Sequence, residues 1–99
     1  MTKTAQPYAD LYAQSLLDSI HETGPDKFKQ VATETSPGVF TSYRKIYDAN
    51  ITMIVDFNKE TVTAKAELIH DRTNTATVTY NFDDYTPPSD DDSIYVKAA

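Results

Sequence analysis

Alternation of apolar and polar residues runs through most of positions 50–83 and constrains the fold more than any other feature. Three segments share it, and in each the apolar side chains fall on one face of an extended chain. The segments are rich in Thr, Val, Ile, Tyr and Phe, which suit a half-buried pleated surface. The pattern therefore predicts three consecutive strands. Their inward-facing residues are Ile51, Met53, Val55 and Phe57, then Val62, Ala64, Ala66 and Leu68, then Ala76, Val78, Tyr80 and Phe82.

The first loop in this block fixes how two of the strands pair, because a slip of one residue turns a strand inside out. A two-residue loop at Asn58-Lys59 places Val55 opposite Val62. The middle strand then carries the small side chains of Ala64 and Ala66 between larger neighbours. These alanines form a shallow trough in which we expect a helix to lie.

The second loop is predicted to contain three residues, 72–74. A loop of four residues would set apolar Leu68 opposite polar Thr77, whereas a loop of three sets it opposite Val78. Asn74 then occupies the last loop position, which commonly requires a left-handed backbone that asparagine tolerates. The alternation and the loops together predict an antiparallel arrangement of the three strands.

A further strand is expected from Val39 to Asp48, although both of its faces are mixed. Another three-residue loop, 48–50, would pair Tyr47 with Ile51 and again end in asparagine. Ser36-Pro37-Gly38, just upstream, is typical of a turn. The segment is interpreted as an edge strand.

Two helices are predicted before the strands. Apolar residues recur at three- and four-residue spacing between Pro7 and Glu22, and Gly24-Pro25 is a stop signal. A second, shorter helix is expected from Pro25 to about Thr33. The stripe of the first helix comprises Tyr8, Leu11, Tyr12, Leu16 and Ile20, and the second helix places Phe28, Val31 and Ala32 on one side.

The predicted fold is a single α+β domain over residues 1–84. One N-terminal helix, with the shorter second one, packs on one face of a four-stranded antiparallel meander, and residues 85–99 form an acidic, partly flexible tail. A chain of 99 residues buries about two-thirds of its unfolded surface, enough for one core. The sequence has no cysteine, no secretory pattern and no apolar run that could span a bilayer, so we expect a cytoplasmic protein.

Charge is unevenly distributed along the chain. Residues 1–50 carry six acidic and five basic side chains, whereas residues 51–99 carry nine acidic and four basic ones, and the net charge is −6. An acidic surface repels nucleic acids and membranes and attracts basic proteins. Solubility alone is an alternative explanation for the net charge. For the acidic cluster near the C-terminus, a basic partner and solubility alone are about equally good explanations.

Little in the sequence indicates catalysis or a cofactor. The only two glycines, Gly24 and Gly38, cannot form a phosphate-binding loop, and His21 lacks a second histidine four residues on. The aspartates at 90–92 lack the spacing and the glycine of a calcium loop. We therefore expect a non-enzymatic protein with no metal or cofactor, and no direct nucleic-acid binding.

Three functional hypotheses follow. The first is an acidic protein that binds and inhibits or regulates a basic, nucleic-acid-handling partner, as phage and mobile-element inhibitors of host nucleases do. The second is an immunity-like or accessory protein that binds through a sheet edge or helix, with charge incidental. The third is a small-ligand-binding domain or enzyme. For the first, the expected contact residues are Asp83, Asp84, Tyr85, Asp90, Asp91, Asp92 and Tyr95.

Overall fold

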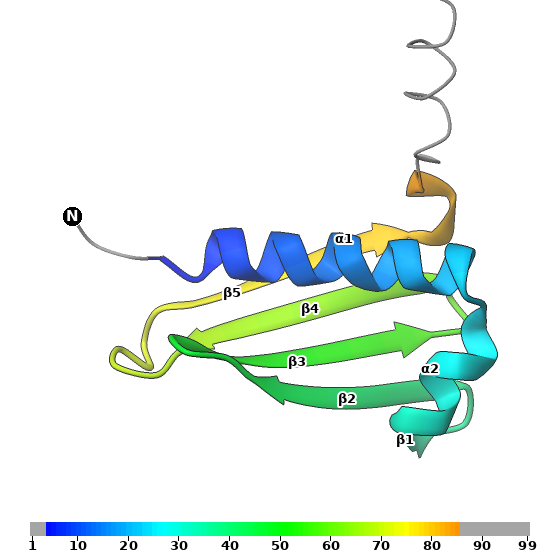
Figure 1. The fold of residues 1–99 in the computed structure, drawn as a ribbon, viewed down its shortest axis with the longest axis horizontal. Coiled ribbons are helices and arrows are strands. Elements are labelled where there is room, and N and C mark those ends of the chain that lie inside the picture. The colour runs from blue at the N-terminus through cyan, green and yellow to red at the C-terminus, as the bar shows by residue number, and fades with distance from the viewer. Residues whose placement is uncertain (1–3, 86–99) are drawn as a thin grey trace, which may run out of the picture.

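The computed structural model describes residues 4–85, which form two helices on one face of a five-stranded antiparallel sheet (Figure 1). The strands follow one another across the sheet in chain order. The α+β class and the meander are confirmed, but the prediction of four strands was wrong. The elements are α1 (Gln6–Glu22), α2 (Pro25–Val31), β1 (Thr33–Ser36), β2 (Val39–Lys45), β3 (Ala49–Asp56), β4 (Thr61–Leu68), β5 (Thr75–Asn81) and the 3-10 helix η1 (Phe82–Asp84).

The additional strand is β1, at one edge of the sheet. Its four residues are all exposed and polar, so no alternation marks it in the sequence. It pairs with β2 through the predicted turn at Pro37-Gly38, where Gly38 has a φ of 79° that favours glycine. The ladder is irregular between Glu34 and Ser36. Pairing with β2, rather than burial, is what makes this segment a strand.

The pairing of β3 with β4 matches the prediction residue by residue. Val55 lies opposite Val62, and Ile51 lies opposite Ala66. The loop, however, is a four-residue turn over 57–60 rather than two residues. Asp56 Oδ1 accepts the backbone N–H groups of the first two polar residues of that turn, at 2.9 and 3.0 Å. This side-chain bonding stabilises the wider turn without changing the register.

The predicted pairing of β4 with β5 was wrong. Val78 lies opposite Ala64 rather than Leu68, a shift of four residues along β4. Because the shift is even, the inward face of β5 is still the predicted one. The connection runs from Ile69 to Asn74, and Asn74 Oδ1 accepts the N–H of Ala5 at 3.0 Å. Asn74 thus holds the start of α1 in place instead of closing a three-residue loop.

The predicted pairing of β2 with β3 was also wrong. Arg44, not Tyr47, lies opposite Ile51, and the strand ends at Lys45. An odd shift exchanges the two faces of the strand, so Phe40 rather than Tyr43 shares the inward face with Ile51. Tyr47 lies in the connection to β3 and is 93% exposed. The two mixed faces of this segment gave no periodic signal that could have fixed its register.

Helix α1 runs along the sheet over β3, β4 and β5, as the alanine trough predicts (Figure 1). Ala64 and Ala66 are fully buried, and so are Ala9 and Ala13 on the helix. Leu11 is 57% exposed and Val31 is 75% exposed, so both were wrongly assigned to inward faces. Small side chains on both surfaces permit a close approach of helix and sheet.

Two groups of buried apolar side chains form the core beneath the helices. One surrounds the start of α1 and the alanines, and the other lies under its C-terminal half and α2. The second includes Leu16, Leu17, Ile20, Phe28, Val55 and Val62. Within residues 4–85, no helix is both long and apolar enough to cross a membrane.

Candidate functional site

Acidic side chains gather along the line where α1 meets β5 and η1. Asp10, Asp18 and Glu22 are separated by multiples of four residues and share one side of α1. Asp18 and Asp84 line the same cavity of about 250 Å³, which also contacts β5 through Tyr80. We refer to Asp10, Asp18, Glu22 and Asp84 as the acidic edge. It combines carboxylates from two segments that lie far apart in the sequence.

Hydrogen bonds fix the acidic edge to the sheet. The hydroxyl of Tyr80 on β5 donates to Asp10 Oδ1, while Gln14 Nε2 donates to Asp10 Oδ2 at 2.8 Å and to the Tyr80 hydroxyl at 3.4 Å. Near the other end, the hydroxyl of Tyr85 donates to Glu22 Oε2 at 3.1 Å. These hydrogen bonds hold Asp10 in place against β5 and Glu22 in place against the residue that follows η1.

Among residues 4–85, no positive charge compensates the acidic edge. None of its four carboxylates forms an ion pair with any residue in the range 4–85, and the cavity beside it is lined by no basic side chain. Uncompensated carboxylates that share one surface create a field that attracts cations. Desolvation by a positively charged partner would strengthen that attraction.

Electrostatics also affect the tyrosine at the centre of this network. The pKa of Tyr80 is raised above its ordinary value of 10.0, mainly because its hydroxyl donates a hydrogen bond to Asp10. Burial and the negative charges of Asp10 and Asp84 raise it further, whereas the hydrogen bond from Gln14 lowers it. Tyr80 consequently stays protonated and acts as a hydrogen-bond donor to the edge.

The predicted site residues separate in the structure. Asp84 belongs to the acidic edge, and its Oδ2 also accepts the N–H of Asn81 at 2.8 Å. Asp83 faces a different hollow, which it lines together with Lys59 and Glu60. The two neighbouring aspartates thus have different surroundings. Asp90, Asp91, Asp92 and Tyr95 lie outside the described residues.

Tyr85 is less exposed than a free contact residue would be. Its ring stacks on His21 with 4.3 Å between ring centroids, and it packs against the core beneath α1. His21 Nε2–H donates to the carbonyl of Phe82 at 2.8 Å. Tyr85 therefore fastens η1 to the end of α1. Its hydroxyl, bonded to Glu22, is the part that reaches the acidic edge.

Three members of the acidic edge were not among the predicted site residues. The spacing of Asp10, Asp18 and Glu22 within the helix is visible in the sequence and could have identified a charged helix face. Their position beside β5 could not be predicted, because it depends on where α1 crosses the sheet. Charged helix faces are also common on ordinary solvated helices.

Within residues 4–85 the acidic side chains form no metal site, and the outer face of the sheet is polar along β4 and β5. No group of three or more His, Cys, Asp or Glu side chains among residues 4–85 is placed to hold a metal ion. The sheet face opposite the helices presents threonines, and two of them, Thr63 and Thr79, bond each other at 3.0 Å. Comparison with family models, with curated proteins and with solved structures finds no match to this chain. We therefore infer function from the geometry.

Proposed function

We propose that this protein binds and inhibits or regulates a basic, nucleic-acid-handling protein in the cytoplasm, without catalysis. The acidic edge is the contact surface. The single observation that supports this function is the alignment of four carboxylates from α1 and η1 with no ion-pair partner among residues 4–85. Complementary charge of this kind steers association and selects basic partners.

The dimensions of the edge suit a site that normally receives nucleic acid. At the helical rise of 1.5 Å per residue, Asp10 and Glu22 are separated by about 18 Å along α1. One strand of duplex DNA carries about five phosphates over that length. A basic groove that binds a phosphate backbone would therefore meet carboxylates along a comparable distance. Inhibitors that occupy such a groove exclude the nucleic acid.

The test uses affinity capture by the tagged full-length protein from its native host, followed by measurement of the purified pair at low and high salt. We expect a stoichiometric complex whose affinity falls steeply as salt screens the charges. The edge variant Asp18→Asn/Glu22→Gln should bind at least about tenfold more weakly, a loss of about 1.4 kcal/mol.

A matched control separates the edge from net charge. The variant Asp26→Asn/Glu67→Gln also removes two negative charges, but from α2 and β4, away from the edge. It should retain most of the affinity for the partner. Equal losses in the two variants would contradict a specific role for the edge. A complex that is indifferent to salt would contradict the proposal as a whole.

A second candidate function is an accessory protein that binds through aromatic side chains, with charge incidental. It is favoured by Tyr43 and Tyr47, which are 76% and 93% exposed. Exposed tyrosines provide contact area at low entropic cost. In that case Tyr43→Ala/Tyr47→Ala would abolish capture of the partner, while the edge variant would bind normally.

A further inference from the structure

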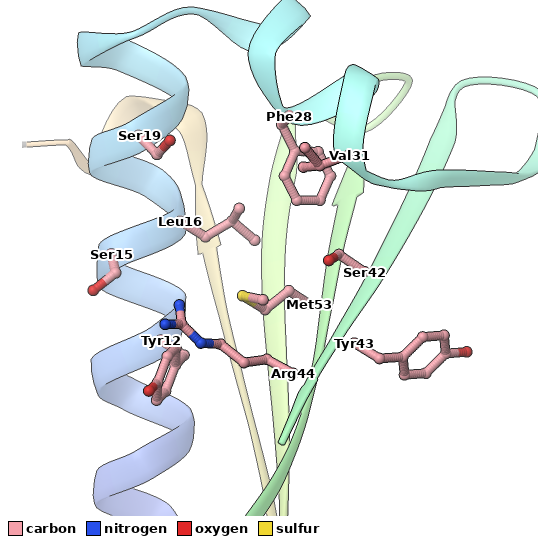
Figure 2. A pocket seen from close by; sticks show the side chains of 10 residues that line it. All are labelled: Tyr12, Ser15, Leu16, Ser19, Phe28, Val31, Ser42, Tyr43, Arg44 and Met53. Carbon is pink, nitrogen blue, oxygen red and sulfur yellow. The ribbon is translucent and has the colours of Figure 1, made fainter. Parts of the chain in front are cut away.

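A second concave surface lies on the opposite side of α1, where the helix leaves part of β2 uncovered. A cavity of about 370 Å³ opens there between α1, α2, β2 and β3 (Figure 2). This volume falls within the range of about 300–1,000 Å³ typical of small-molecule sites. Its apolar wall is formed by Leu16, Phe28 and Met53, of which the first two belong to the core. A ligand seated here would contact the parts of these side chains that border the cavity.

Arg44 supplies a positive charge to this cavity. Its side chain extends from β2 toward α1, and its guanidinium carbon lies 5.8 Å from the ring centre of Tyr12 (Figure 2). The Arg44 side chain forms no ion pair and no hydrogen bond with any residue between 4 and 85. Its guanidinium donors, whose planar arrangement suits a carboxylate, are therefore available to a ligand.

A neighbouring hydroxyl adds to the polar part of the cavity. Ser42 precedes Arg44 by two residues on β2, so both side chains lie on the face that bears the helices. The Ser42 hydroxyl points from β2 toward the α1 side of the cavity in Figure 2 and has no hydrogen-bond partner among the described residues. It offers a second donor beside the apolar wall.

Charge complementarity identifies the class of ligand. None of the ten residues that line the cavity is acidic, and Arg44 is the only one with a positive charge. The carboxylates of the acidic edge project from the opposite side of α1, toward β5. A cation beside an apolar wall fits a molecule that has an anionic head and an apolar body.

We propose that this cavity binds a small monocarboxylic acid with an aliphatic or aromatic body. The carboxylate accepts hydrogen bonds from the Arg44 guanidinium, and the body packs on Leu16, Phe28 and Met53. Ser42 donates a further hydrogen bond to the head group. This site is independent of the acidic edge, so either proposal can fail without the other.

The test is an NMR titration of the isotope-labelled full-length protein with octanoate below its micelle-forming concentration. We expect saturable shifts of the Met53 methyl group and the Leu16 methyl groups. Octanol has the same body without the charge and should bind about tenfold more weakly, because it lacks the charge-assisted hydrogen bonds. Acetate has the charge without the body and should cause no saturable shift.

Two substitutions that each remove one positive charge from β2 test the position of the binding site. Arg44→Gln should weaken octanoate binding at least about tenfold. Lys45→Gln changes the next residue, whose side chain lies on the other face of β2, and should leave binding within about twofold. Ser42→Leu inserts an apolar side chain into the cavity and should abolish binding. Circular dichroism melting checks that each variant is folded.

Several results would overturn the proposal. Equal affinities for octanol and octanoate would show that Arg44 does not bind the carboxylate. Equal effects of Arg44→Gln and Lys45→Gln would show the same. Shifts confined to the threonine face of the sheet would place the ligand elsewhere. Met53 shifts that depend on protein concentration in the absence of ligand would indicate that a second copy of the chain occupies the cavity.

Discussion

At the scale of single residues, Tyr80 links the helix layer to the edge of the sheet. Its hydroxyl donates to Asp10 and accepts from Gln14, so three side chains from two elements hold one another in position. The bond to Asp10 requires the protonated form of tyrosine and is lost when Tyr80 ionises. The folded state consequently retains the Tyr80 proton more strongly than the unfolded chain does.

This linkage predicts how Tyr80 and stability respond to alkaline pH. Because its folded pKa is raised above 10.0, its contribution to stability is fully present below about pH 10 and is lost as pH rises through the folded value. Asp10→Asn should lower the pKa of Tyr80, whereas Gln14→Ala should raise it. The difference between the ultraviolet titrations of each protein and its Tyr80→Phe counterpart measures this pKa. If both variants shifted the pKa of Tyr80 in the same direction, the opposite effects assigned to Asp10 and Gln14 would be contradicted.

At the scale of elements, alanines determine how closely α1 approaches the sheet. Ala9 of the helix and Ala66 of β4 belong to the same buried group and are both fully buried. Close packing of this kind leaves no space for larger side chains, and overpacking typically costs about 1–3 kcal/mol. Tight contact between small residues adds to the predicted apolar stripe, of which Leu16 and Ile20 are buried and Leu11 alone is exposed.

We therefore expect Ala9→Leu to reduce the free energy of unfolding by about 1–3 kcal/mol in urea denaturation. Leucine and alanine both favour helices, so helix propensity contributes only a small part of such a loss. Leu11→Ala is the control on the exposed side of α1 and should change stability by no more than about 0.5 kcal/mol. A larger loss from Leu11→Ala than from Ala9→Leu would show that Leu11, rather than Ala9, packs on the sheet.

The elements also show which parts of the fold the sequence could predict. The β3–β4 pairing was predictable because strict alternation continues on both sides of a short turn. The β4–β5 register was not, because Asn74 bonds to the start of α1, a contact between residues 69 positions apart. Strand β1 has no apolar residue to mark it. Strict alternation on both sides of a turn therefore predicted the β3–β4 register and the inward faces of β3, β4 and β5. Segments without alternation, β1 and β2, gave neither their pairing nor their faces.

The candidate site follows the same division. Asp84 and Tyr85 were identified from a local concentration of acidic and aromatic residues after Tyr80. Their proximity to Asp18 and Glu22 could not be predicted, because it depends on where α1 lies along β5. The different surroundings of Asp83 and Asp84 depend on the same placement. Arg44 was assigned no role because the register of β2, which turns it toward the helices, was not predictable.

At the scale of the whole molecule, opposite charges occupy opposite sides of α1. Carboxylates follow its junction with β5, and Arg44 lies on the side of β2. The chain has a net charge of −6, and the clustering of carboxylates at the acidic edge adds repulsion within the folded state. Asp18 and Glu22, four residues apart on the helix, repel each other directly. A surface retained for binding is expected to reduce stability in this way.

The repulsion predicts that Asp18→Asn stabilises the protein by about 0.2–0.5 kcal/mol at low ionic strength. The gain should disappear near 1 M salt, where charges are screened beyond about 3 Å, and the parent protein should itself become more stable as salt is added. Asp26→Asn is the matched control, because Asp26 lies in the first turn of α2, where a negative charge is favourable, so its loss should be neutral or destabilising. Urea midpoints at low and high salt measure all three proteins. Destabilisation by Asp18→Asn at low salt would mean that the carboxylates of the edge support the fold, and their arrangement would then need no partner to explain it.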